Sequence, residues 1–256
     1  MAVVDNAGLP FLLEGQVAVS TRPQRLEVVI AAAAPPGALE NTRRLLELWV
    51  AAADFGMFTD ADPRLSHMNL RAPSGSEAGE ITARLETAGV DPGAYRVLLN
   101  MLAQSHYAVD PLQRVSLRSE GAAAGRVVGP ERLAQLRCAP HCDTPPFALF
   151  IPQPVEENAQ PVIRLQFSRR LAANEFEHVA HGLQIWDDVI AAEGFAGGFE
   201  PVELMEAAAE CYLLSPDTVE HPCDGAPDQP VAYDALLNMA VKLDATFCPI
   251  RVLEID

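Results

Sequence analysis

The stretch YRVLLNM at residues 95–101 returns as YDALLNM at residues 233–239, which lies 138 positions later in the chain. Five of the seven positions are identical, and the same offset places Pro92 on Pro230 without a gap. Self-similarity at a fixed offset is the signature of an internal duplication. The sequence therefore predicts two halves that share one fold.

A second repeated pattern precedes the first in each half. Between residues 39 and 55, apolar side chains recur every three or four positions, which is typical of an amphipathic helix. Residues 176–190 reproduce this stripe at an offset of 137, with Trp49 and Trp186 as shared anchors. Asn174, a residue type favoured at helix N-caps, predicts where the second of these helices begins.

Short runs rich in apolar residues predict strands around these helices. The first half has the order strand, strand, helix, two strands, helix, strand, and the second half follows it less clearly. Without the first strand, this is the order of a split β-α-β, ferredoxin-like unit. We therefore predict an α+β fold: a tandem duplication of a ferredoxin-like unit with an extra N-terminal strand in each half, forming a pseudo-dimer.

The repeats divide the chain into three segments. Residues 1–119 are the first α+β repeat, residues 146–256 are the second, and residues 120–145 match neither half. This unmatched insert begins like a linker and ends in cysteine, histidine and proline residues. It is therefore predicted to lie outside both repeats, where it can cover the seam between them.

The charge balance argues against two classes of partner. The chain has 35 acidic and 18 basic residues, which gives a formal net charge of −17, and no basic cluster interrupts the sequence. Such a chain repels a phosphate backbone and an anionic membrane surface. We expect no nucleic acid and no membrane among its partners.

Several features indicate a cytoplasmic, bacterial protein. The N-terminus lacks the basic and apolar regions of a signal peptide, and no run approaches the length of a membrane span. Five cysteines, an odd number, fit reduced thiols better than a disulfide framework. A single lysine, Lys242, among 18 basic residues suggests a GC-rich coding sequence.

Two segments carry side chains of the types that bind zinc. Cys138, His141 and Cys142 end the insert, and His221 and Cys223 lie in a segment of the second half. Their spacing matches no standard zinc motif, so reduced cysteines without a metal are the alternative. If zinc is the cofactor, we expect the two segments to approach each other.

The repeated stretch itself supplies a second candidate site. On a helical wheel, Asn100 and Asn238 fall away from the apolar stripes of their helices, beside Met101 and Met239. Two interpretations remain open: common descent from one ancestral half, or use at a contact between the halves or between subunits. The second makes these four residues candidate ligand or interface residues.

Motifs for nucleotide binding and for serine hydrolases do not occur in the sequence. Our first hypothesis is therefore a cytoplasmic binding or scaffold protein that holds a small molecule or a protein partner between its halves and can form homo-oligomers. The alternative hypothesis is a zinc-dependent enzyme that uses the Cys and His residues of the insert and of residues 221–223.

Overall fold

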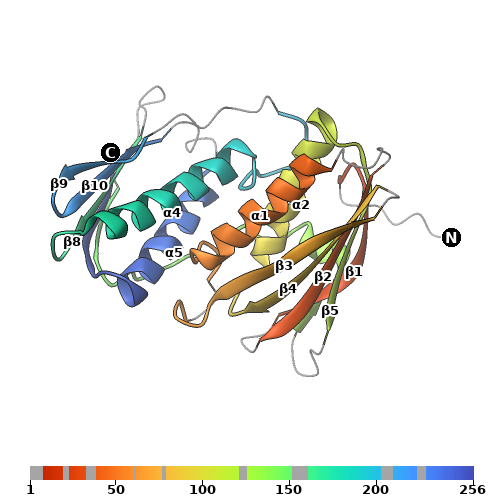
Figure 1. Ribbon diagram of the computed structural model, residues 1–256, viewed down its shortest axis with the longest axis horizontal. Coiled ribbons are helices and arrows are strands. Elements are labelled where there is room, and N and C mark those ends of the chain that lie inside the picture. The colour runs from red at the N-terminus through yellow and green to blue at the C-terminus, as the bar shows by residue number, and fades with distance from the viewer. Residues whose placement is uncertain are drawn as a thin grey trace.

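Two mixed β-sheets form the outer layers of the molecule, and the long helices lie between them (Figure 1). The computed structural model describes residues 8–19, 23–32, 39–59, 62–76, 79–120, 126–151, 161–202, 210–223 and 229–256. Five helices occur within these ranges. The chain therefore has the α+β class that its sequence predicts.

The first sheet has the strand order β3-β4-β2-β5-β1-β6. β5 is parallel to β1 and antiparallel to β2, and the short β6 pairs with the outer side of β1. The elements of this half and of the insert are β1 (Leu12–Val19), β2 (Gln24–Ala32), α1 (Glu40–Asp54), β3 (His67–Ser76), β4 (Glu80–Ala88), α2 (Gly93–Ala108), β5 (Leu112–Glu120), β6 (Arg126–Val128) and α3 (Pro130–Leu133).

The second sheet has the strand order β7-β11-β8-β10-β9. Read in this sheet order, the strands take the places of β1, β5, β2, β4 and β3, and each adjacent pair has the same relative direction as in the first sheet. The elements of this half are β7 (Ala148–Phe150), β8 (Val162–Phe167), α4 (Ala173–Ala191), β9 (Tyr212–Ser215), β10 (Thr218–Pro222), α5 (Val231–Thr246) and β11 (Ile250–Ile255). Most of residues 201–210, which the sequence left undecided between strand and helix, lie outside the described residues.

A fully buried tryptophan anchors the first long helix of each half. Trp49 of α1 donates from Nε1 to the carbonyl of Ala94 at 2.7 Å, and Trp186 of α4 donates to the carbonyl of Ala232 at the same distance. A buried indole N–H needs such an acceptor, because leaving it unpaired is costly. The anchors predicted from the sequence therefore make the same contact in both halves.

The helices of the two halves pack against each other along a seam, and one hydrophobic core spans both halves. Phe58 and Phe195, which are 137 positions apart, lie at this seam with ring centroids 6.4 Å apart. The approach is close at Gly182 of α4, where a Cβ atom would come within 2.8 Å of Phe55 and 3.1 Å of Met239. Glycine is therefore the residue that fits at this point.

Candidate functional site

Each of the repeated asparagines donates a hydrogen bond across the seam to a backbone carbonyl of the other half. Asn100 of α2 donates from Nδ2 to the carbonyl of Gly194 in the second half at 2.8 Å. Asn238 of α5 donates to the carbonyl of Met57 in the first half at 3.2 Å. Because Met57 and Gly194 are themselves 137 positions apart, the two bonds are the same contact made in opposite directions.

This burial corrects the prediction that both asparagines lie on an outer face. Asn100 is fully buried and Asn238 is 6% exposed, and Met101 and Met239 are buried beside them. In α2, every residue from 93 to 105 is buried, because the face turned away from its own sheet is covered by the second half. The helical wheel identified that face, but it gave no sign of what covers it.

Residues 129–142 of the insert, here called the strap, contact both halves at the seam. Asn238 donates to the carbonyl of Pro140 at 2.8 Å, and the amide of Asn100 lies 3.5 Å from the sulfur of Cys138. Burial raises the pKa of the Cys138 thiol to about 11, although nearby Arg96 partly opposes this rise. Cys138 is therefore a protonated thiol that packs in the seam at neutral pH.

The strap is also held at the first turns of α2 and α5. Arg96 donates to the carbonyl of Ala134, and Asp234, which is 138 positions after Arg96, accepts from Arg137 and His141. The His141 Nδ1 atom lies 2.6 Å from Asp234 Oδ1, and the histidine side chain is 58% exposed. These contacts fix the strap over the seam, and on its other side the His141 ring places Nε2 3.5 Å from Asp143 Oδ1.

The five predicted zinc ligands do not form one group. Cys138 contacts Asn100, and His141 contacts Asp234, whereas His221 contacts Asp187 at 2.7 Å. Cys142 is half-buried and Cys223 is buried. Among the described residues, no group of three or more His, Cys, Asp or Glu side chains has a geometry that could hold a metal ion.

His221 and Asp187 form a buried pair inside the second half, with side chains that are 1% and 4% exposed. Val28 of β2 pairs with Ala83 on one side and with Leu117 on the other. In the second half, Ile163 of β8 pairs in the same way with His221 and with Ile255. Because Leu117 and Ile255 are 138 positions apart, His221 occupies the place of Ala83. The pair therefore stands where the first half has an apolar side chain.

Further polar atoms surround this pair. Burial raises the pKa of Asp187, although its bond to His221 opposes the rise, and burial with nearby Cys223 raises the pKa of Tyr233 to about 12. Asp187 also has a side-chain hydrogen bond with Cys223, whereas within the described residues His221 Nδ1 and the Tyr233 hydroxyl have no hydrogen-bond partner. Buried polar atoms are normally paired, so this cluster is costly to the fold. Its two central side chains have almost no contact with solvent.

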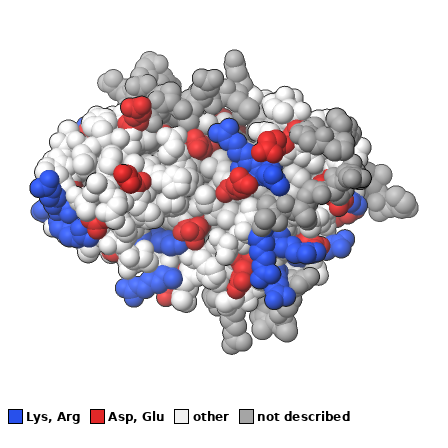
Figure 2. All heavy atoms as spheres, in the orientation of Figure 1, with Lys and Arg blue, Asp and Glu red and all other residues white. Residues whose placement is uncertain are grey.

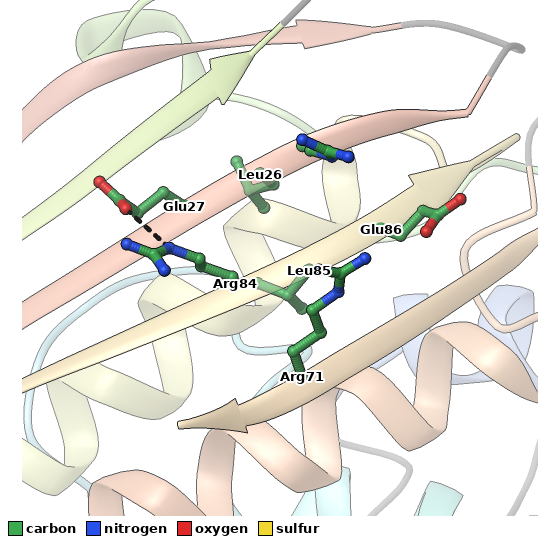
Figure 3. A pocket seen from close by; sticks show the side chains of 7 residues that line it. Leu26, Glu27, Arg71, Arg84, Leu85 and Glu86 are labelled. Atoms are coloured by element: carbon green, nitrogen blue, oxygen red, sulfur yellow. Dashed lines mark hydrogen bonds and ion pairs between the residues drawn. The ribbon is translucent and has the colours of Figure 1, made fainter. Parts of the chain in front are cut away.

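A pocket of about 260 Å³ opens on the outer face of the first sheet, on the side away from the helices. Its lining comes from β2, β3 and β4, and consists of Arg25, Leu26, Glu27, Arg71, Arg84, Leu85 and Glu86. Figure 3 shows Glu27, Arg71, Arg84 and Glu86 on these three strands, with Arg84 directed toward Glu27. In the lower right of Figure 2, basic side chains gather over this sheet with acidic side chains beside them.

The pocket was missed in the sequence because its residues are far apart in the chain. Arg25 and Glu27 alternate with buried residues on β2, and Arg84 and Glu86 do so on β4. Such alternation predicts only a sheet with one solvated face. The pairing of β4 with both β2 and β3 brings Arg71 to the same place, and no local pattern contains that pairing.

No protein-family model and no curated protein sequence matches the chain. Among solved structures, the crystal structure of a conserved protein from Enterococcus faecalis V583 aligns with 10% sequence identity. The alignment covers 91% of this chain and 76% of that protein, and its TM-score is 0.17, which is too low to support an argument. No helix within the described ranges is long and apolar enough to cross a membrane.

Proposed function

We propose that this chain is a cytoplasmic binding protein in which two ferredoxin-like halves are fused as a pseudo-dimer. The repeated sequence, the shared strand order and the reciprocal bonds of Asn100 and Asn238 support this description. Fusion of two such halves replaces a separable homodimer by a permanent one. Its two subunit-like halves can then differ, so that a ligand needs to be recognised by only one of them.

The ligand site of this proposal lies on the outer face of the first sheet and not at the seam. Protein side chains fill the seam: Phe58, Phe195 and both asparagines are buried there, and the strap contacts it. The pocket on β2, β3 and β4, by contrast, is open to solvent and combines charged side chains from three strands. A concave site with a few convergent polar groups is the usual form of a small-molecule site. This pocket is the observation that carries the proposal.

A ligand screen followed by mapping tests the proposal. We expect that a set of small acidic, basic and neutral molecules contains compounds that raise the melting temperature of the full chain, because a ligand that binds only the folded state stabilises it. Hydrogen exchange with a stabilising compound should then show protection in β2, β3 and β4.

Two results would contradict this proposal. One is a screen in which no compound raises the melting temperature. The other is protection confined to the strap and to the starts of α2 and α5, which would return the site to the seam. Arg170→Gln, which removes one exposed positive charge from the second half, is the matched control and should leave the response unchanged.

A further inference from the structure

We propose that the pocket on the outer face of the first sheet takes a small anion that carries several oxygen atoms, a phosphate or a polycarboxylate, and holds it with Arg25, Arg71 and Arg84. This inference rests on the proposed binding function and names the chemical class of its ligand. Its evidence lies in the charge, the strand register, the pairing and the size of the pocket.

The pocket has the opposite charge to the chain as a whole. Three arginines and two glutamates line it, which gives a local formal charge of 3 − 2 = +1 in a chain of net charge −17. A local positive site in a negative field attracts an anion only through short-range contacts, because the long-range field repels it. The ligand must therefore be bound by direct hydrogen bonds from guanidinium groups.

The strand register places like charges opposite each other at one position of the pocket, whereas Arg25 stands opposite Glu86 and Arg84 opposite Glu27. Arg71 of β3 pairs directly with Arg84 of β4, and like charges at such a position are destabilising in a sheet. Glu27, which pairs with Arg84 from β2, also pairs with Arg118 on its other side, so one carboxylate lies between two arginines. An anion between Arg71 and Arg84 would relieve this repulsion.

Two of the three arginines have few partners among the described side chains, although Arg25 stands directly opposite Glu86 in the register. Arg25 and Arg71 form no salt bridge or side-chain hydrogen bond with another described residue, and Arg84 meets Glu27 through a single long contact of 3.4 Å. A guanidinium carries five N–H donors in a planar fork that matches carboxylate and phosphate oxygens. A register shift in β3 directly after Arg71 marks a bulge, a feature that redirects side chains at the edges of sheets.

The size and lining of the pocket restrict the ligand further. Adjacent strands lie about 4.8 Å apart, so side chains on β2, β4 and β3 span roughly 10 Å, which an anion of a few heavy atoms bridges. The lining contains no aromatic side chain on which a nucleobase could stack. The carboxylates of Glu27 and Glu86 also repel a polymer that carries many negative charges. A small phosphate or polycarboxylate fits these limits better than a nucleotide does.

The second half does not carry this site. Pro222, 138 positions after Arg84, pairs with Val162 in the same way that Arg84 pairs with Glu27. Neither side chain can bind an anion through a charged donor or compete for one. The anion site is therefore a property of the first half alone, and the second half serves as an internal reference for the shared fold.

Calorimetric titration of the full chain with inorganic phosphate and, separately, with citrate tests the inference. Arg71→Gln should lower the affinity for the anion about tenfold or more, because a hydrogen bond to a charged group contributes that much to binding. Arg170→Gln, an equal charge change in the second half, should leave the affinity unchanged. Glu27→Gln should strengthen binding, since it removes a carboxylate that competes for Arg84 and repels the ligand.

The inference is supported if phosphate, citrate or both bind saturably, and if this binding is lost in Arg71→Gln and retained in Arg170→Gln. The anion that binds then shows whether the site takes phosphate oxygens, carboxylate oxygens or both. No saturable heat at millimolar concentrations of either anion would overturn it, and so would equal weakening by the two arginine variants. Arg71 is exposed, so a folding defect in Arg71→Gln is not expected, and circular dichroism checks this. If a neutral or cationic compound protects β2, β3 and β4 while neither anion binds, the anion inference fails and the binding function stands.

Discussion

The cores of the two halves differ at one pair of corresponding positions. The first half has Val50 after Trp49 and has Ala83 on β4, whereas the second half has Asp187 and His221 at the corresponding places. Taking a polar, ionisable pair out of water is costly, and the pair returns this cost only when its geometry is good. Because the first half forms the same strand order with apolar side chains, the fold does not require the pair.

The outer faces of the two sheets also differ, and here the first half carries the charged side chains. The first sheet carries the arginine-lined pocket, and the second has Val162 and Pro222 where the first has Glu27 and Arg84. The first half therefore differs from the second on the outer face of its sheet, and the second differs from the first in its core. Such differences are expected of the proposed duplication, because either half can change while the other continues to support the seam.

The largest effect is expected when the buried pair of the second half is broken. His221→Ala, which installs the residue of the first half, leaves Asp187 buried without its partner. Losing one member of a buried pair costs about 3–5 kcal/mol, and the low end applies here because Asp187 can take up a proton. Denaturant unfolding of the variant should therefore show a loss of about 3 kcal/mol.

The double variant Asp187→Val with His221→Ala copies the first half completely and serves as the control. Its loss in free energy of unfolding should be about 1–3 kcal/mol smaller than the sum of the two single losses, because neither member of the pair is left buried without the other. If the double variant loses as much as that sum, the two residues act independently, and the comparison between the two cores fails.

A smaller effect is expected from the asparagines that bind the seam. Asn100→Ala and Asn238→Ala each leave backbone carbonyls without a donor, at a cost of about 1–3 kcal/mol. Each asparagine bonds a second carbonyl, Asn100 that of Ala196 at 3.0 Å and Asn238 that of Pro140 at 2.8 Å, so Asn100 should be the more costly to replace only because it is fully buried. Asn41→Ala, which removes a bond from Asn41 to a side chain of its own half, is the control and should cost less. Equal losses in all three variants would remove the distinction between the seam and the rest of the core.

Features that repeat with the helical period were predictable from the sequence. The helices predicted at residues 39–55 and 176–190, α1 and α4, begin and end within a few residues of these bounds, and both tryptophans are buried as the apolar stripes indicate. The strands of the first half were predicted from short apolar runs, and β2 and β4 alternate between buried and solvated positions, the period of two that a strand has. Local periodicity therefore specified most of the elements.

Features that depend on contacts between distant elements could not be predicted in this way. Asn100 was expected on an outer face, because a helical wheel gives the direction of a side chain but not the second half that covers it. The cap of α4 was expected at Asn174, but the backbone amide of Ala172 is bound by Glu175, three residues later. The arginines of the pocket meet only through the pairing of three strands.

The smallest expected effect compares the N-termini of α1 and α4. No side chain caps α1 at Leu39, whereas Glu175 accepts from the amide of Ala172 at 2.8 Å and from Arg169 at 2.6 and 2.7 Å. These contacts, chiefly the one with Arg169, lower the pKa of Glu175 from 4.5 to about 2. A carboxylate with a lowered pKa in the folded state stabilises the protein above its usual pKa, and this contribution is lost as the pH falls through the lowered value.

Glu175→Gln should therefore lower the melting temperature at neutral pH by a small amount, because exposed ion pairs contribute little. The difference between the variant and the natural sequence should shrink as the pH falls from 4.5 to about 2, the window that the lowered pKa of Glu175 defines. Glu40→Gln makes the same change in the first turn of α1, where no side chain caps the helix, and should show no such pH dependence. A difference for Glu175→Gln that stays constant across this pH range would mean that its charge does not cap α4, and the two helix starts would then be equivalent.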